Sequence, residues 1–354
     1  MNLDASITTP SVQPLLAAER TAPKPEPAPA RTRKKLRVLD ALEKPIEFII
    51  RVCGWSSIIG IAAIFIFIFK EAAPMVPKLD WIQFFTSPRW IPNPAPGNEA
   101  SFGALALLIG TFSTTFIALI IAVPIGLGAA VYISEFAKGK VKETLKIVIE
   151  LLAAIPSIVW GFIGLMVLGP IVQKVFSATP GSGWDKVLLT LHLTSHEGGA
   201  SQGTNLLTGG IILALMSVPV IVSLSEDALR AVPDSFREAA LALGANPWET
   251  VRRVLFPAAR NGLLAACLLG MGRAIGETMA VLLATGHNLR IPTSLTDPVR
   301  TMTATIAAEM GETVNGGEHY RMLFILGIVL FVMTCSINVA SDLIIKGVKK
   351  ANKA

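Results

Sequence analysis

The sequence predicts an all-α integral membrane protein with six transmembrane helices. Of its 354 residues, 52% are hydrophobic and only 16% are charged, and the mean hydropathy is +0.59. A bilayer core takes about 20 apolar residues per helical crossing. Six runs meet this requirement, at about 47–69, 102–133, 146–172, 206–225, 262–285 and 322–345. The second and third runs exceed it, which predicts that they tilt or extend beyond the lipid.

The first 45 residues differ from the rest of the chain. Six prolines fall within the first 30 positions, and the basic run RTRKKLR follows at 31–37. Such a composition buries no core, so residues 1–45 are predicted to form a disordered tail and residues 46–354 the six-helix domain. A basic run beside a membrane helix is expected to lie against anionic lipid rather than nucleic acid.

The placement of the positive charges predicts the orientation of the chain. With the N-terminus inside the cell, 22 of the 31 Lys and Arg residues fall in cytoplasmic segments and eight fall outside. The excess of positive charge on one side places both termini in the cytoplasm. Segments 70–101, 173–205 and 286–321 are then external, and residues 297–312 show the apolar spacing of a short surface helix.

Two charged residues lie within the fifth apolar run. Arg273 and Glu277 occur in MGRAIGETMAVLLATG at 271–286, and a charge at the centre of a membrane helix costs roughly 3 kcal/mol. Residues four apart on a helix are neighbours on one face. The pair either neutralises itself or serves a function, and intramembrane ionisable residues are usually functional.

Prolines, serines and glycines mark the other crossings. Pro124, Pro156 and Pro219 fall in the second, third and fourth runs, where they kink helices and free backbone carbonyls. Ser157 and Ser217 lie close to two of these prolines and are candidates for lining a polar path. The small residues at 126–130, with Gly161 and Gly164, indicate close helix packing.

Histidine and cysteine suggest little chemistry. His192 and His196 have the spacing of a metal-ligand pair on a helix, but the neighbouring Gly, Ser and Thr residues favour a loop. We therefore predict no metal site and no catalytic residue. The three cysteines fall within apolar runs and indicate no disulfide framework.

The cytoplasmic loop between the fourth and fifth crossings, at 226–261, is the most informative polar stretch. Asp234 or Ser235 is placed to cap a helix through REAALAL, and Gly244 is placed to end it. Pro247 suits the first turn of a second helix, which Pro257 is expected to end. Two short helices joined by a tight elbow are predicted.

This loop resembles the EAA loop of binding-protein-dependent ABC import permeases. The matching residues are Glu238, Ala239, Ala240, Gly244, Val254, Phe256 and Pro257, with Phe256 standing where Leu is usual. The resemblance implies the MetI-like permease fold and a coupling helix that docks on a separate ATPase. No G-x-x-x-x-G-K-[ST] loop occurs in the chain, so we expect a non-catalytic permease subunit that binds no cofactor, with ATP and Mg²⁺ on the partner.

Further motifs resemble the phosphate-specific (Pst) permeases of the PstC type. These are RAIGETMA at 273–280, ELLAAIPSIVWG at 150–161, WIP at 90–92 with FG at 102–103, TMTATIAAEMGE at 301–312, and Asn338. The resemblance implies an inner-membrane phosphate importer with a PstA-like second permease, a PstB-like ATPase dimer and a PstS-like phosphate-binding protein.

On this resemblance, three residues of RAIGETMA are candidates for the substrate path. The guanidinium of Arg273 can hold two phosphate oxygens at once. Glu277 would pair with Arg273 when the path is empty, or would accept a hydrogen bond from protonated phosphate. Thr278 follows on the same segment.

Other functions remain open at this level. The EAA loop suits an importer of another oxyanion, such as sulfate, molybdate or phosphonate. A secondary transporter in which Glu277 relays a proton would not need the EAA loop. A membrane scaffold would leave both the buried charges and the loop unexplained.

Overall fold

The computed structural model describes residues 30–97, 99–177, 180–195 and 202–351. The chain divides into two compact units, residues 1–65 and 66–354, which are described separately. In the described residues, six helical segments are long and apolar enough to cross a membrane, which agrees with the number predicted. They are Pro45–Ala72, Leu105–Phe136, Ser157–Phe176, Leu206–Arg230, Pro247–Ile275 and Glu318–Ala340.

The first helix begins earlier than its apolar run. Helix α2 covers Ala30–Ala72, with Pro45 inside it, so residues 30–45 are helical where a disordered tail was predicted. Between Pro29 and Pro45 the chain contains no proline or glycine and is rich in Arg, Lys and Leu, which favour helix. The rest of the predicted tail, residues 1–29, lies outside the described residues.

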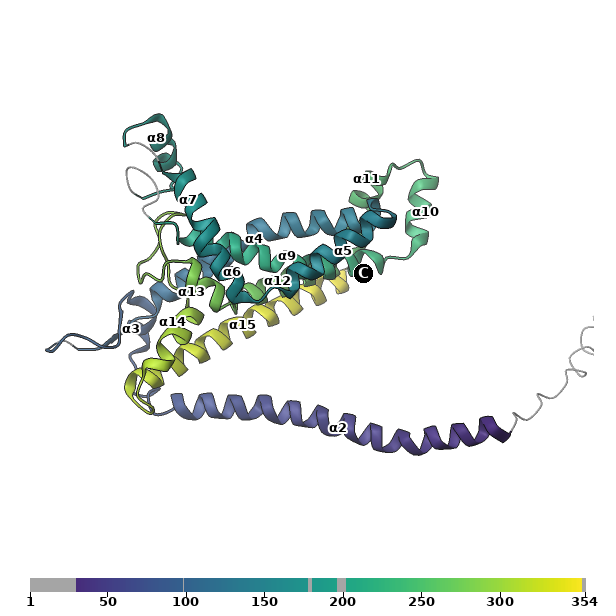
Figure 1. Ribbon diagram of the computed structural model, residues 1–354, viewed down its shortest axis with the longest axis horizontal. Coiled ribbons are helices and arrows are strands. Elements are labelled where there is room, and N and C mark those ends of the chain that lie inside the picture. Colours follow the sequence, from purple (N-terminus) through teal and green to yellow (C-terminus); the bar gives the residue numbers. More distant parts are fainter. Residues whose placement is uncertain (1–29, 98, 178–179, 196–201, 352–354) are drawn as a thin grey trace, which may run out of the picture. The chain divides into compact units, whose positions relative to one another are not determined.

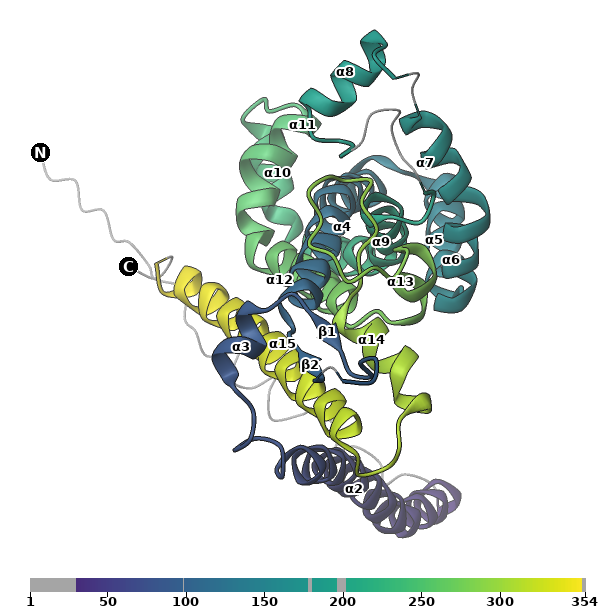
Figure 2. The same cartoon turned by 90° about the vertical axis from the view of Figure 1, so that its left-hand side faces the viewer.

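Three helices form the centre of the second unit. Helices α4 (Leu105–Val131), α9 (Leu206–Arg230) and α12 (Phe256–Ile275) pack against one another, and the end-on view places α4 and α9 in the middle (Figure 2). The side chain of Ile221 on α9 fits between Gly126 of α4 and Gly270 of α12. A Cβ atom added at either glycine would lie 2.6 Å from Ile221. The glycines therefore set the close approach of these helices, as predicted for Gly126.

The third apolar run does not form one helix. It divides into α5 (Gly139–Ala154), α6 (Ser157–Ile163), the π-helical segment η3 (Gly164–Leu168) and α7 (Gly169–Phe176). The predicted crossing at 146–172 is therefore wrong, and the membrane-length segment begins at Ser157. The break falls at Ile155, whose backbone is extended (ψ 125°), because a residue before proline avoids the helical conformation.

The fifth run is also divided. Helix α12 ends at Ile275, and the short helix α13 covers Met279–Ala284. The predicted continuous crossing at 262–285 is therefore wrong. Helix α14 (Met302–Glu309) continues into the 3₁₀ turn η5 (Met310–Glu312) within the predicted helical segment 297–312. It is not a surface helix, because Met302, Thr303, Ala304 and Thr305 are all buried.

The remaining elements lie at the two ends of the bundle (Figure 1). One end carries α3 (Trp81–Thr86), α8 (Gly183–Thr190), and the antiparallel strands β1 (Trp90–Ile91) and β2 (Ser101–Phe102). The opposite end carries α10 (Asp234–Ala242), α11 (Pro247–Thr250) and the C-terminal end of α15 (Glu318–Ala351). Elements from the predicted external segments 70–101 and 173–205 therefore lie at one end, and elements from the predicted cytoplasmic loop 226–261 lie at the other.

Candidate functional site

The chain between α12 and α13 leaves the helical conformation at residues 276–278. Glu277 lies in this break and accepts hydrogen bonds through both its side chain and its backbone carbonyl. Its Oε1 accepts hydrogen bonds from the backbone N–H of Thr278 (3.1 Å) and Ala280 (3.3 Å). Its carbonyl accepts one from the hydroxyl of buried Thr303 on α14 (2.6 Å). Irregular backbone in a membrane protein persists where it is buried in protein or lines an aqueous cavity, so this break is a candidate for the substrate path.

The break changes the predicted relation between Arg273 and Glu277. Glu277 lies beyond the end of α12, so the two residues do not share a helix face, and no ion pair joins them among the described residues. Arg273 lies in the last turn of α12, where the helix dipole favours a positive charge. Its side chain is exposed and has no hydrogen-bond partner within the described part of the chain.

The other predicted path residues lie on neighbouring elements. Ser157 is the first residue of α6 and is half-buried, and Ser217 lies within α9 and is buried. The Ser217 hydroxyl has no hydrogen-bond partner among the described atoms. Helices α6, α9 and α13 contact one another, and Met216, next to Ser217, shares a buried cluster with Trp160 of α6 and Ala280 of α13. Within the described residues, the Thr278 hydroxyl donates to the nearby carbonyl of Gly276 (3.3 Å).

The predicted cytoplasmic loop forms two helices and a tight connection, as expected. Residues 234–255 comprise α10, α11 and the π-helical segment η4 (Val251–Leu255), and we call them the coupling elbow. Gly244 ends α10 with a φ of +84°, which glycine adopts without strain. Asn246 then caps α11: its side chain accepts from the Glu249 N–H (2.8 Å), and Glu249 accepts from the Asn246 N–H (3.0 Å). Pro247 occupies the first turn, as predicted.

Pro257 does not end a helix, contrary to expectation. The chain continues from η4 into α12, with Pro257 in the first turn of α12. In η4 the Phe256 N–H donates to the Val251 carbonyl, five residues back. This wider turn changes the backbone path ahead of the proline, where a regular helix would clash with the proline ring. The coupling elbow is therefore continuous with α12.

The residues of the EAA motif divide between the surface and the interior of the coupling elbow. Glu238 and Ala239 are exposed, and Ala240 is the one buried residue of α10. Val254 and Phe256 are half-buried, and Pro257 is exposed. Phe256 packs against the cluster that contains Leu255, Ala259 and Leu263. Three large apolar side chains are exposed on α10 and at its C-cap: Phe236 (49%), Leu241 (54%) and Leu243 (89%). An apolar surface of this kind suits a protein partner.

At the other end of the bundle, Glu309 joins three segments. Its carboxylate accepts hydrogen bonds from Trp90 Nε1 (2.9 Å) and Arg300 (2.5 Å) and lies 2.8 Å from His319 Nε2. It thereby joins WIP at 90–92, TMTATIAAEMGE at 301–312 and the start of α15. The sequence marks these two motifs separately, but no spacing pattern reveals their contact.

The metal-ligand alternative has no support from the described residues. His192 has a left-handed backbone (φ 53°) and follows the end of α8. His196 lies outside the described residues, and those residues contain no cluster of three or more ligand-type side chains.

Comparison with known proteins identifies the class. Residues 122–350 match the family model of the binding-protein-dependent transport system inner membrane component. This chain belongs to that family of ABC importer permeases, as the EAA loop predicts, and the predicted fold class is confirmed.

The relatives are curated permeases from several bacteria. The PstC phosphate transport system permease protein of Mesorhizobium japonicum is 39% identical over 260 residues, which cover 71% of this chain and 74% of that one. The PstC protein of Haemophilus influenzae is 38% identical, covering 70% and 77%. The YqgH protein of Bacillus subtilis, described as a "probable ABC transporter permease", is 36% identical, covering 81% and 86%.

Proposed function

We propose that this chain is a channel-forming subunit of an ATP-driven importer of inorganic phosphate. The observation that carries the proposal is its similarity to PstC phosphate permeases, at 38–39% identity over about 70% of the chain. The break at 276–278 supports a polar path through the protein, and the coupling elbow supports a link to a motor.

The proposed complex has three kinds of partner. A PstA-like permease would pair with this chain in the membrane, and a PstB-like ATPase dimer would bind the exposed side of α10. A PstS-like protein would deliver phosphate at the end of the bundle that carries β1, α8 and α14. This subunit would be non-catalytic and would hold no cofactor, because ATP and Mg²⁺ would bind to the ATPase. No interaction with nucleic acid is proposed.

The orientation follows from the same assignment. A cytoplasmic ATPase requires the coupling elbow to face the cytoplasm, and the excess of Lys and Arg in the loops on that side agrees. The C-terminal end of α15 lies at the same end of the bundle as the coupling elbow (Figure 1), which supports a cytoplasmic C-terminus. One crossing precedes the first external segment, 70–101, so the N-terminus would lie on the opposite side of the membrane from that segment, in the cytoplasm.

Arg273 is the proposed phosphate contact. Its guanidinium is always charged and presents donors that match two phosphate oxygens. Its exposure and lack of a partner within the described chain leave these donors available. Ser157, Ser217 and Thr278 are proposed to offer hydroxyl groups along the same path. Glu277 is proposed to hold the break in shape, because its carboxylate is occupied by backbone N–H groups.

The test is phosphate uptake in cells that express Arg273→Gln as the only copy of this permease. We expect uptake to fall at least about tenfold, since a bidentate charged contact is lost. The amount of ATPase that copurifies with the permease should not change. The matched control is Arg290→Gln, an exposed arginine in the segment after α13, which should retain uptake. Normal uptake by Arg273→Gln would remove Arg273 from the path.

Competition distinguishes phosphate from other oxyanions. Unlabelled sulfate, molybdate or phosphonate should not reduce uptake of labelled phosphate by the wild-type complex. If one of them competes as well as unlabelled phosphate, the subunit serves a broader oxyanion importer.

A further inference from the structure

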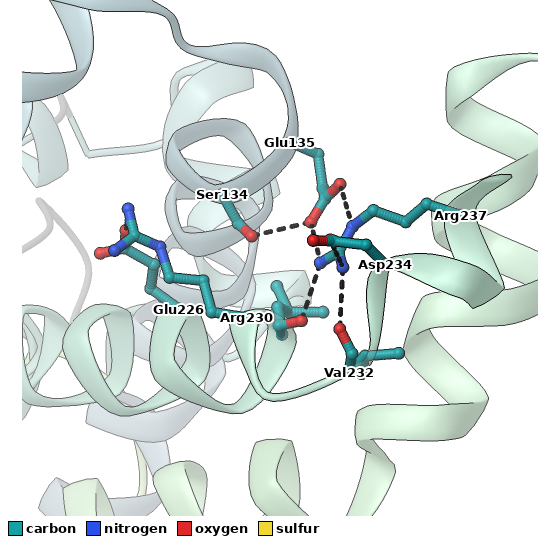
Figure 3. A network of polar contacts seen from close by, with 8 residues as sticks. Ser134, Glu135, Glu226, Arg230, Val232, Asp234 and Arg237 are labelled. Carbon is teal, nitrogen blue, oxygen red and sulfur yellow. Dashed lines mark hydrogen bonds and ion pairs between the residues drawn. The ribbon is translucent and has the colours of Figure 1, made fainter. Parts of the chain in front are cut away.

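Arg237 connects the coupling elbow to the membrane helices. It lies on α10, one residue before Glu238, and its side chain is 20% exposed. Its Nε donates to Glu135 Oε2 (3.1 Å) and one terminal nitrogen donates to Glu135 Oε1 (2.9 Å), as Figure 3 shows. This two-point contact fixes orientation as well as distance. Glu135 is 14% exposed, so the pair is shielded from much of the solvent.

The same guanidinium also binds the end of α9. It donates to the carbonyls of Leu229 (2.9 Å) and Val232 (2.8 Å). Leu229 lies in the last turn of α9 and Val232 lies two residues beyond its end, so the arginine adds donors to carbonyls at the end of this helix. The fourth partner of Arg237 is Asp234 (3.0 Å), whose side chain is 87% exposed, so this ion pair is expected to contribute little.

Glu135 belongs to the end of α4. It lies in η2 (Tyr132–Phe136), the π-helical segment that continues α4, and it accepts a further hydrogen bond from Ser134 (2.8 Å). Since α4 and α9 pack closely along their length, Arg237 holds α10 to the common end of two paired helices. Hydrogen bonding to Glu135 raises the pKa of Arg237 above its ordinary value, so the guanidinium stays charged.

Few other contacts attach α10 to the bundle. Of its residues only Ala240 is buried, and the helix packs mainly against α11 and η4, which belong to the same elbow. Its large apolar side chains are exposed. Through the backbone, residues 231–233 join α10 to α9, and the rest of the elbow joins α10 to α12. Among the described contacts, the Arg237–Glu135 pair is the hydrogen-bonded link from α10 to the end of α4.

We propose that Arg237 is a positioning residue that transmits movement of α10 to the paired ends of α4 and α9. This inference rests on the proposed function, because it assigns the coupling between ATP hydrolysis and transport to one contact. Glu135 is the acceptor that makes the contact directional. Loss of either side chain would leave α10 docked on the ATPase while its movement was no longer transmitted to the paired ends of α4 and α9 through this contact.

The experiment uses the full complex of both permeases and the ATPase dimer in proteoliposomes, supplied with the phosphate-binding protein. Phosphate uptake, ATP hydrolysis and the amount of copurified ATPase are measured together. We expect Arg237→Gln and Glu135→Gln each to lower phosphate transported per ATP hydrolysed about tenfold. ATP hydrolysis and ATPase copurification should stay within about twofold of wild type, since no group at the ATPase surface is altered.

Two further variants separate coupling from simple structural support. The double variant Arg237→Gln/Glu135→Gln should be no worse than either single variant, because both act through one contact. The control Asp234→Asn, which alters the exposed partner of the same arginine, should keep the transport ratio within about twofold of wild type.

The outcomes separate the inference from the function on which it rests. An unchanged transport ratio in Arg237→Gln would overturn the positioning role, and so would loss of ATPase copurification in both single variants. Failure of the wild-type complex to take up phosphate would instead overturn the proposed function.

Discussion

The break at residues 276–278 and the coupling elbow both carry charged side chains, but these side chains find their hydrogen-bond partners in different ways. At the break, the Glu277 carboxylate accepts backbone N–H groups one and three residues ahead, and Arg273 has no partner in the described chain. At the elbow, Arg237 and Glu135 bind each other across 102 residues of sequence. The Glu277 carboxylate is thus held by local N–H groups, while its carbonyl is bonded by Thr303 on α14, and Arg273 stays unpaired within the described chain. The elbow is held by a long-range contact in which the charges of Arg237 and Glu135 are paired with each other.

The largest expected effect tests whether Glu277 acts at the break through its shape or through its charge. Glu277→Ala removes the acceptor for two N–H groups, which costs about 1–3 kcal/mol when they stay buried. We expect phosphate uptake to fall at least about tenfold. Glu277→Gln keeps an acceptor oxygen, so its uptake should stay within about threefold of wild type.

The contrast between these two variants is decisive. If Gln is as inactive as Ala while both proteins are inserted in equal amounts, the negative charge itself is required. Glu277 would then act on the substrate or on a proton, and the break would resemble the elbow in its use of charge.

The second prediction concerns the contact between α4 and α9, which joins the two regions. A Cβ at Gly126 would lie 2.6 Å from Ile221 Cγ2, whereas nothing lies within 4 Å of one at Gly128. Gly126→Ala should lower the stability of the complex by about 1–3 kcal/mol, because a packed interface resists extra volume. Gly128→Ala should be neutral or stabilising by up to about 1 kcal/mol.

Thermal unfolding of the purified complex in detergent compares these two variants directly. Equal shifts in Tm would mean that close approach at Gly126 does not determine how α4 and α9 pack.

The third prediction concerns the local part of the elbow. Asn246→Ala removes the cap of α11 and should cost about 1 kcal/mol. Faster hydrogen exchange at the Glu249 amide would report the loss. Asn246→Asp keeps the acceptor and should preserve the protection. If Asn246→Ala also lowers phosphate transported per ATP hydrolysed as strongly as Arg237→Gln, then the elbow depends on hydrogen bonds to backbone N–H groups, as the break does.

The smallest expected effect concerns pH at the segment that follows α13. Burial, together with the nearby Arg300, lowers the pKa of His287 to about 4. A histidine held neutral in the folded state loses stability as the pH falls from about 6.5 to about 4, because the unfolded chain binds the proton first. Allowing for its partial exposure, we expect a loss of about 1 kcal/mol across this window.

His287→Asn should flatten this dependence. Asparagine tolerates the left-handed backbone at this position, where φ is 52°. Tm is measured between pH 7 and pH 4.5 for both proteins, and parallel curves would exclude His287 as the titrating group.

Particular residues show where sequence reasoning succeeded and where it failed. The elbow was predictable because its signals are local: Gly244 ends α10 and Pro247 starts α11. The apolar runs at 146–172 and 262–285 were misjudged because hydropathy does not register a change in backbone direction. Pro156 gave a signal for the first break, but Pro257, in a similar setting, is accommodated by a π-helical turn.

By itself, the sequence determined the number of crossings, the elbow and the family, because each depends on composition or on spacing within one segment. Only the tertiary structure decided what the charged groups do. It separates Glu277 from Arg273, assigns Thr303 to the carbonyl of Glu277 and brings Arg237 to Glu135. These contacts join segments 26 and 102 residues apart, and their geometry depends on how the helices between them pack, which no local pattern encodes.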